Sequence, residues 1–317
     1  MTDLDAAVRR AAGPNAEVFG VHRAPSPYAT VFPAEVVSVE LTSGERISIF
    51  VKHLGKEQQD HPDKRVRERE VRVYGELFGD PGLPVPRFLG SGWNDATGRR
   101  ELFLEYIDGW NLKYQELRHW YTAARRLAQL HLAFARRADQ LLERDFLLRL
   151  DRDYLLAWAE RAVAAVSSLS AGLAGRLRPT VDDLGAAVDL LSEQPPTLVH
   201  NDLAPKNVIA DTSASPDRTC IVDWEMAGVG CGLMDLAHLM HGLSPSEAQR
   251  MFDLYSEELA GTGLMPAEEE EGKRLLASCL LHGTLYRLAH ADVWRLPLER
   301  VEEWIAEGEE LNREVAR

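Results

Sequence analysis

Cysteine and long apolar runs are scarce in this chain of 317 residues. The three cysteines, at 220, 231 and 279, are odd in number and lack CxxC spacing. They therefore predict neither a disulfide framework nor a thiolate zinc site, and they are typical of a reducing compartment. No stretch approaches the roughly 18 apolar residues that a transmembrane helix needs. Residues 1–14 also lack the apolar core of a secretory signal, so we expect a cytoplasmic protein without a membrane partner.

Basic residues are fewer than acidic residues in this chain. The chain has 36 basic and 50 acidic residues, a formal net charge of −14, and this disfavours a general nucleic-acid binder, which would usually be basic. Most of the excess lies after residue 107, because residues 1–107 carry −2 and residues 108–317 carry −12. A field of that sign attracts cations. Solubility is the alternative explanation, with Glu268–Glu271 at a solvated helix start.

The pattern along the chain predicts an α+β protein with two lobes. Residues 31–40 and 46–53 have the composition of strands and are joined by a Thr-Ser-Gly turn, which predicts a hairpin. A helix is expected over residues 63–77 and a strand over residues 100–107. Helical periodicity then dominates, interrupted by a β island at residues 197–224. We therefore predict a small β-rich lobe over residues 1–107 and a larger, mainly helical lobe over residues 108–317. The helices expected in that second lobe span residues 114–137, 154–168, 181–192, 246–259, 266–290 and 298–315.

The β island contains the strongest chemical signal. His200, Asp202 and Asn207 form the pattern H-x-D-x-x-x-x-N, and Asp223 closes an apolar strand 16 residues after the asparagine. Phosphoryl transfer needs a carboxylate to accept the proton of the acceptor hydroxyl, and Asp202 is the candidate. It also needs oxygen ligands for Mg²⁺, for which Asn207 and Asp223 are candidates.

A phosphate-binding lysine would complete this set. Lys52 ends the strand at residues 47–52 and could neutralise the α- and β-phosphates. An acidic residue must orient that lysine, and Glu70 in the following helix is our choice. Glu68 is the alternative, since two residues along a helix change the face.

At these residues the chain resembles the aminoglycoside phosphotransferase and choline-kinase-like family, relatives of the protein kinases. The L-A-x-L-H stretch at 127–131, the G-x-x-x-x-D-L-A segment at 230–237 and the hinge-like stretch at 102–109 resemble it too. The resemblance implies a bilobal kinase fold, ATP as donor, Mg²⁺ as cofactor and a small-molecule hydroxyl as acceptor. It makes Asp202 the catalytic base, Asn207 and Asp223 the metal ligands, Lys52 with Glu70 the phosphate-side pair, and Glu105 and Ile107 the backbone contacts of adenine.

Several features depart from the protein-kinase pattern. Residues 24–31, where a glycine-rich loop would lie, contain no glycine, so Ser26, Thr30 and backbone N–H groups are the candidates for phosphate contact. Ala204 stands where protein kinases have a lysine, and no A-P-E follows. No Ser, Thr or Tyr lies between Asp223 and Asp235. We therefore expect neither a phosphorylation switch nor a protein acceptor held along that loop.

Three functions compete. The acidic second lobe favours a kinase of a small cationic molecule, such as an aminoglycoside or a related antibiotic. The same chemistry could act on a metabolic acceptor, such as choline, ethanolamine, homoserine, a sugar or a nucleoside. A nucleotide-binding pseudokinase is the third possibility.

Some polar residues near the motif also have structural interpretations. We expect His200 to order the catalytic loop, His131 to be a core histidine and Asp235 to be a cap or loop anchor. Glu225 could serve either structure or ligand binding. Tryptophans of the helical lobe could line a cation site, although core packing is the simpler interpretation.

Overall fold

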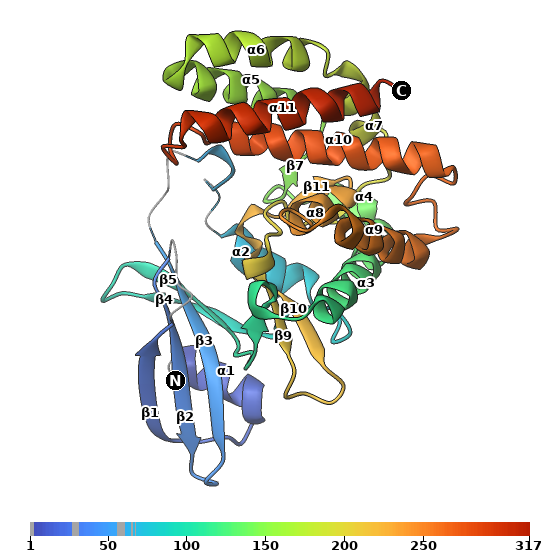
Figure 1. The fold of residues 1–317 in the computed structure, drawn as a ribbon. Coiled ribbons are helices and arrows are strands. Elements are labelled where there is room, and N and C mark those ends of the chain that lie inside the picture. The colour runs from blue at the N-terminus through green and yellow to red at the C-terminus, as the bar shows by residue number, and fades with distance from the viewer. Residues whose placement is uncertain (1–2, 27–31, 56–60, 65, 67) are drawn as a thin grey trace. The chain divides into compact units, whose positions relative to one another are not determined.

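The computed structural model describes residues 3–26, 32–55, 61–64, 66 and 68–317. Packing divides the chain into two compact units. Unit 1 comprises residues 1–119 and 206–227, and unit 2 comprises residues 120–205 and 228–317. This division differs from the single boundary predicted at residue 107, because residues 206–227 pack with the N-terminal part of the chain. A mixed architecture, with a β-sheet N-terminal region and a helical C-terminal region, confirms the α+β prediction (Figure 1).

Unit 1 is built on a five-stranded antiparallel sheet in the order β1-β2-β3-β5-β4. The predicted hairpin is confirmed as β2 and β3, and Gly44 in its turn has a φ of +85°, a conformation that suits glycine. The predicted strand at residues 100–107 is β5. The strands are β1 (Val18–Pro25), β2 (Ala34–Leu41), β3 (Arg46–Leu54), β4 (Phe88–Asn94) and β5 (Arg99–Glu105).

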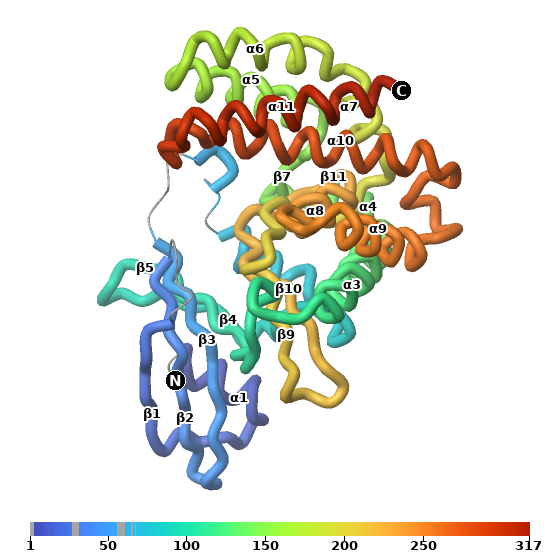
Figure 2. The backbone as a smooth tube through the Cα atoms, viewed as in Figure 1, coloured from blue at the N-terminus to red at the C-terminus, as the bar shows by residue number. Residues whose placement is uncertain are grey.

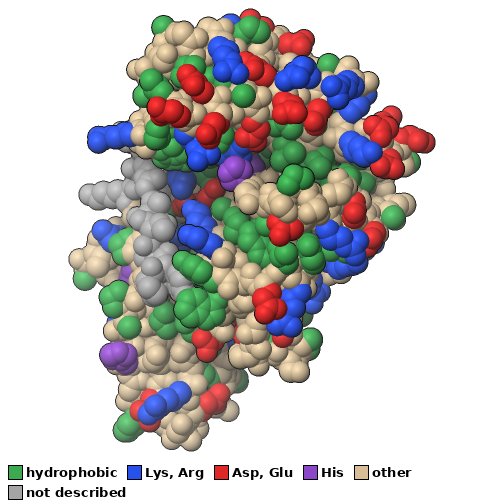
Figure 3. All heavy atoms as spheres, in the orientation of Figure 1, with side chains coloured by type: hydrophobic (Ala, Val, Ile, Leu, Met, Phe, Trp, Pro, Cys, Tyr) green, Lys and Arg blue, Asp and Glu red, His purple; other side chains and the backbone are tan. Residues whose placement is uncertain are grey.

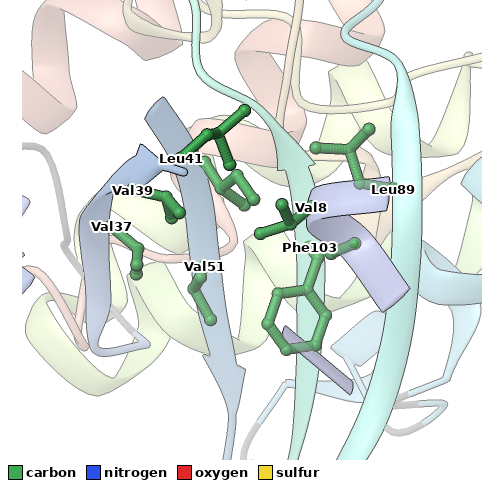
Figure 4. Close-up of a cluster of buried hydrophobic side chains, with 9 residues drawn as sticks. Val8, Val37, Val39, Leu41, Val51, Leu89 and Phe103 are labelled. Carbon is green, nitrogen blue, oxygen red and sulfur yellow. The ribbon is translucent and has the colours of Figure 1, made fainter. Parts of the chain in front are cut away.

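One face of this sheet is covered by α1 (Asp3–Ala12), a helix that our sequence analysis did not predict. Ala7 and Val8 of the helix are fully buried against strand residues that include Val39 and Phe103. Figure 4 shows Val8 among the valine, leucine and phenylalanine side chains of the sheet. Leu4, Ala7, Val8 and Ala11 recur at i, i+3, i+4 and i+7, so the helical period is present in the sequence and was overlooked.

The prediction of a single helix over residues 63–77 was wrong. The described residues form a 3-10 turn η1 (Pro62–Lys64), one helical turn α2 (Arg69–Arg72) and a π-helical turn η2 (Val73–Leu77). Unit 1 also contains a second sheet, in the order β10-β9-β6. Gly109, just before β6, approaches the backbone so closely that a Cβ would lie 2.5 Å from the Ala210 carbonyl oxygen. The remaining elements here are β6 (Trp110–Asn111), η3 (Leu112–Tyr114), η4 (Pro205–Asn207), β9 (Val208–Asp211), β10 (Arg218–Ile221) and η5 (Trp224–Met226).

Unit 2 is mainly helical. Helix α10 packs against α5, α8 and α11, and α5 packs against α6 (Figure 2). A capping box between Ser244 and Glu247 begins α9. A small sheet in the order β7-β11-β8 joins Leu148–Arg149, Gly228–Gly230 and Thr197–Val199. The helices are α3 (Leu117–Ala135), α4 (Ala138–Leu142), α5 (Arg152–Leu169), α6 (Ala171–Asp182), α7 (Gly185–Ser192), α8 (Leu233–Leu239), α9 (Pro245–Leu259), α10 (Glu269–Leu288) and α11 (Leu298–Val315).

Five of the six helices predicted in the second lobe are present within a few residues of their expected bounds. The helix expected at 181–192 is present as α7, but it begins at Gly185, and residues 181–182 belong to the end of α6. Helix α6 was missed because Pro179 and two glycines weaken its helical signal. Within the part of the chain that the structure describes, no helix has the length and apolarity that crossing a membrane requires.

Candidate nucleotide pocket and catalytic loop

Lys52 lies at the centre of a buried charge cluster in unit 1. Its ammonium nitrogen is 2.6 Å from Glu70 Oε2 and 2.5 Å from Asp223 Oδ1. The β3 register pairs Lys52 with Ala34 on one side and Leu102 on the other, and this pairing fixes where the side chain leaves the sheet. Three residues that are far apart in sequence therefore meet at one point.

The charges in this cluster determine its protonation. Burial alone lowers the pKa of Lys52, but the carboxylates of Asp223, Glu70 and Glu225 outweigh it, and the net pKa is raised. Lys52 is thus an ammonium at physiological pH. Burial raises the pKa of Glu70 to about 7 against the opposing charge of Lys52, because the carboxylate has lost its solvent and lies near Asp223 and Glu225.

Two basic residues hold the Glu70 segment against the Asp223 segment. The buried Arg69 guanidinium donates to the backbone carbonyl of Asp63 and, at 2.7 Å, to that of Glu225. The Lys64 ammonium forms an ion pair with the Glu225 carboxylate. Glu225 therefore helps to hold these two segments together, through its carboxylate and its backbone carbonyl. The alternative lysine partner, Glu68, instead forms an ion pair with Arg100 at 2.7 Å, so Glu70 is the acid that contacts Lys52.

A pocket of about 150 Å³ surrounds this cluster, entirely within unit 1. Its lining brings together seven of the predicted nucleotide and metal-site residues and also Glu225, whose role the sequence left open, and Thr30 lies outside the described residues. Aliphatic and aromatic walls next to a few charged groups are typical of a nucleotide site. The predicted residues in the lining are Ser26, Lys52, Glu70, Glu105, Ile107, Asn207 and Asp223, and the apolar walls include Phe32, Phe50, Leu104, Ile209 and Val222.

The hinge-like stretch after β5 forms one wall of the pocket. The Glu105 carboxylate accepts two hydrogen bonds from Arg218, at 2.8 and 2.9 Å. The Glu105 N–H donates to the Arg87 carbonyl at 3.0 Å, and the Ile107 carbonyl accepts from Gly109 at 3.0 Å. These bonds hold the backbone in place and direct the Glu105 side chain towards Arg218.

Asn207 and Asp223 are the candidate metal ligands, and both line the pocket. The Val222 N–H donates to the Asn207 carbonyl at 2.9 Å, which ties the two segments together. Asp223 has a φ of +69°, an uncommon conformation for a non-glycine residue. One carboxylate and one amide oxygen fit Mg²⁺, which usually takes one or two protein carboxylates together with substrate phosphates.

The loop with Asp202 belongs to unit 2 and is anchored by Asp235. The Asp235 carboxylate accepts the backbone N–H groups of His200 at 2.6 Å and Asn201 at 2.8 Å. His131 contacts the same carboxylate at 3.3 Å and Tyr255 at 2.7 Å. Burial would raise the pKa of Asp235, but the hydrogen bond and charge of His131 and the contacts with His200 lower it. Asp235 is therefore a charged loop anchor.

His131 is a buried core histidine in contact with Asp235 and Tyr255. His200 contributes to loop order, since the Asp202 N–H donates to its Nδ1 at 3.3 Å. These contacts hold the backbone of the Asp202 loop. The interpretation of Asp235 and His131 as structural residues thus agrees with their surroundings.

Several residues that sequence reasoning missed help to build the pocket. Lys64, Arg69 and Arg218 contact backbone or carboxylates of the lining, and Lys206 and Asn111 lie in the lining itself. No local pattern distinguishes them from solvated polar or charged residues. The only signal was the density of charge at residues 63–72, which surface salt bridges would equally explain.

The fold and this pocket define a protein-kinase-like phosphotransferase. The model of the phosphotransferase enzyme family matches residues 39–271, most of the chain, and the chain belongs to that family. Homoserine kinase from Rhizobium etli is 31% identical over 126 residues, which cover 40% of this chain and 37% of that protein. The chain thus spans little more than a third of the length of this curated relative.

Solved structures show the same fold. A microcompartment-associated aminopropanol kinase has a TM-score of 0.61 at 16% identity, covering 98% of this chain and 95% of that chain. Choline kinase from Cryptosporidium parvum has a TM-score of 0.62 at 16% identity, covering 92% and 90%. A GDP complex of an aminoglycoside 2′-phosphotransferase IIIa variant has a TM-score of 0.61 at 14% identity, covering 99% and 97%.

Proposed function

We propose that this phosphotransferase moves the γ-phosphoryl group of ATP to a hydroxyl of a small molecule in the cytoplasm, with Mg²⁺ as cofactor. The observation that carries the proposal is the contact of Lys52 with both Glu70 and Asp223 inside a pocket with apolar walls. A charged lysine fixed by two carboxylates is suited to neutralising phosphate oxygens, and apolar walls are suited to a base.

Each residue then has a role. Lys52 binds the α- and β-phosphates and Glu70 orients it, while Ser26 and Thr30 lie in the segment proposed to approach the phosphates. The carbonyl of Glu105 and the N–H of Ile107 meet adenine. Asn207 and Asp223 would hold Mg²⁺, which when bound offsets the charge of the phosphates.

Asp202 is the proposed catalytic base. It accepts the hydroxyl proton as the acceptor oxygen bonds to the γ-phosphorus. The bond from that phosphorus to the β–γ bridging oxygen breaks, and ADP leaves. Because catalysis here is mostly positioning and charge stabilisation, the anchored loop at Asp235 supports this role.

The acceptor can be narrowed to two candidates. Aminoglycosides or related cationic antibiotics were suggested by the acidic second lobe. However, many of those acids form surface ion pairs, such as Arg176 with Glu309 and Arg178 with Glu160. Acidic and basic side chains are interspersed over the helices on the face that Figure 3 shows. This supports the solubility explanation of the charge, and the homoserine kinase relatives favour a small metabolic alcohol as the second candidate.

The test is direct. Purified protein is incubated with Mg-ATP and a panel of cationic antibiotics, amino alcohols and neutral alcohols, and products heavier by one phosphoryl group are sought by mass spectrometry. A product that forms with the wild type and not with Asp202→Ala supports the proposal. Binding of ATP without any phosphorylated product in the panel would contradict it and favour the pseudokinase.

A further inference from the structure

The side chain of Asn111 lines the pocket of unit 1 and takes no visible part in holding the fold together. Asn111 is 9% exposed and belongs to the lining. Its Oδ1 is buried and has no hydrogen-bond partner among the described residues. Buried polar groups are nearly always hydrogen-bonded, so an unpartnered amide in the wall of a pocket indicates a contact with a ligand.

The local backbone does not use this amide. Asn111 stands at the N-cap position of η3, where the side chain of an asparagine usually accepts a backbone N–H. Here the side chain makes no capping hydrogen bond. The turn is closed without it, since the Gln115 N–H donates to the Leu112 carbonyl at 2.9 Å. The requirements of the turn therefore do not explain why a polar side chain is present.

Strand pairing fixes where Asn111 lies in the pocket. In the antiparallel pair of β6 and β9, Asn111 is opposite Ile209, which also lines the pocket. Residues directly opposite each other project from the same face of a sheet, with Cβ atoms about 5 Å apart. Gly109, just before β6, keeps the two strands close, because a Cβ there would lie 2.5 Å from the Ala210 carbonyl oxygen. Asn111 is thus held beside Ile209.

This place lies between the two ends of the proposed nucleotide site. Ile107, whose N–H is the proposed adenine contact, precedes Asn111 by four residues, and Gly109 between them is also in the lining. On the other strand, the candidate metal ligand Asn207 precedes Ile209 by two residues. In a nucleotide the sugar separates the base from the phosphates. A side chain between the adenine wall and the metal ligand therefore faces the sugar.

An amide is chemically suited to sugar hydroxyls. Its oxygen accepts hydrogen bonds and its nitrogen donates them, and each hydroxyl does both. The χ2 torsion of asparagine is broad, so a rotation of the amide brings Oδ1 to the open side of the lining. Lys206 also lines the pocket, but an ammonium can only donate. The acids of the lining are held in ion pairs with Lys52, Arg218 or Lys64, and they are Glu70, Asp223, Glu105 and Glu225.

We propose that Asn111 selects the sugar of the phosphoryl donor, by hydrogen bonding through its side-chain amide to the 2′- and 3′-hydroxyls of a ribonucleoside triphosphate. This inference rests on the proposed function, because it names which nucleotides the same site accepts. Ribonucleotides bind in preference to their 2′,3′-dideoxy analogues, and the preference is lost when the amide is removed.

Nucleotide binding to the full chain tests the proposal without relying on turnover. ATP and 2′,3′-dideoxy-ATP have the same base and the same triphosphate and differ only in the two hydroxyls. Isothermal titration in the presence of Mg²⁺ should give a Kd for ATP about tenfold below that for the dideoxy analogue, as one or two net hydrogen bonds provide.

Two variants separate sugar recognition from a structural role. Asn111→Leu keeps the approximate volume and removes the amide. It should weaken ATP binding about tenfold and leave the Kd for dideoxy-ATP unchanged. Its melting temperature should equal or exceed that of the wild type, because an unpartnered amide is no longer buried. Asn111→Asp keeps the acceptor oxygens and should retain most of the preference for ATP.

Asn94 of β4 offers a matched control in the same unit. Its amide is structural, since Nδ2 donates to Glu101 Oε1 at 2.8 Å and Oδ1 accepts the Ala96 N–H at 3.1 Å. Asn94 is not among the lining residues of the pocket. Asn94→Leu should therefore lower the melting temperature and leave the ratio of the two Kd values at that of the wild type.

The outcomes distinguish this inference from the proposed function. If ATP binds but the wild type does not prefer it over dideoxy-ATP, or if Asn111→Leu keeps the wild-type ratio, the inference is wrong and the kinase function stands. A melting temperature of Asn111→Leu well below that of the wild type would give the asparagine a structural role and overturn the inference. If the wild type binds neither nucleotide, the proposed function fails, and the inference fails with it.

Discussion

The buried guanidinium of Arg69 donates to the backbone carbonyl of Glu225 at 2.7 Å. Through this bond the short helix α2, which carries Glu70, is attached to the segment that carries Asp223. Arg69, which is not among the lining residues of the pocket, therefore helps to keep Glu70 and Asp223 together on either side of Lys52.

Arg69→Met removes this attachment while keeping most of the apolar stem. Two buried carbonyls lose a donor, and the expected loss of unfolding free energy is about 1–3 kcal/mol. We expect kcat to fall and the KM for ATP to rise, since Glu70 no longer has a fixed position. Arg72→Met is the control, because Arg72 lies on the same helix and pairs with Glu76 at the surface. Equal kinetics for both variants would contradict the positioning role.

Lys52→Met removes the ammonium from between Glu70 and Asp223. Two carboxylates then face each other in a buried pocket without a cation, so ATP should bind more weakly and turnover should fall by about 10²–10³. Steady-state kinetics with varied ATP measure this, and Lys273→Met, which affects an exposed ion pair on α10, is the control. Unchanged ATP kinetics would mean that another lysine contacts the phosphates.

Asp202→Ala removes the proposed base. We expect kcat to fall by about 10²–10⁴, the usual contribution of general-base catalysis, with ATP affinity nearly unchanged. Isothermal titration with ATP and phosphoryl-transfer assays separate the two effects. Asp95→Ala, an exposed acid in the β4–β5 turn, is the control. A full-rate Asp202→Ala enzyme would refute the assignment.

Asp223→Asn retains the shape of the side chain but removes its charge. Carboxylates are preferred over amides as Mg²⁺ ligands, so the variant should need more Mg²⁺ for half-maximal activity. A Mg²⁺ titration at fixed ATP measures the shift. A curve that coincides with that of the wild type would exclude Asp223 as a ligand.

His282 should make the protein sensitive to acid. Burial lowers its pKa to about 3 in the folded state, below the ordinary value of 6.5, so the unfolded chain takes up a proton first as the pH falls. Stability from this group is therefore present above pH 6.5 and is lost on the way down to pH 3, by about 1.4 kcal/mol per pH unit.

Urea unfolding at several pH values measures this slope. His282→Asn should flatten it, whereas His22→Asn, on exposed strand β1, should leave it unchanged. Equal slopes for His282→Asn and the wild type would show that other groups control the acid sensitivity.

Much of the candidate site could be predicted from sequence because its signals are local. The spacing of Asp202, Asn207 and Asp223 depends on short strands and turns that the chain forms within 25 residues. Lys52 was identifiable because it follows a run of strongly apolar strand residues, although β3 continues to Leu54 instead of ending at Lys52 as predicted. The family resemblance then suggested a role for each residue that the sequence pattern had already singled out.

Other features depended on long-range packing. The choice between Glu70 and Glu68 required the actual path of the described residues from 68 to 77, which form one α-helical turn and one π-helical turn. The Arg69 contact joins residues 156 apart in sequence, and nothing in the local pattern distinguishes it from a surface charge.

The sequence by itself determined the family and the α+β class and offered Lys52 as the candidate phosphate-side lysine, because these follow from residue types at fixed spacing and from hydrophobic periodicity. Only the tertiary structure decided which acid meets Lys52, how residues 206–227 join the first unit, and which rings of α5 and α10 contact one another. Those relationships depend on side chains that meet after folding, and periodicity shows which face of a helix is apolar but not which partner that face contacts.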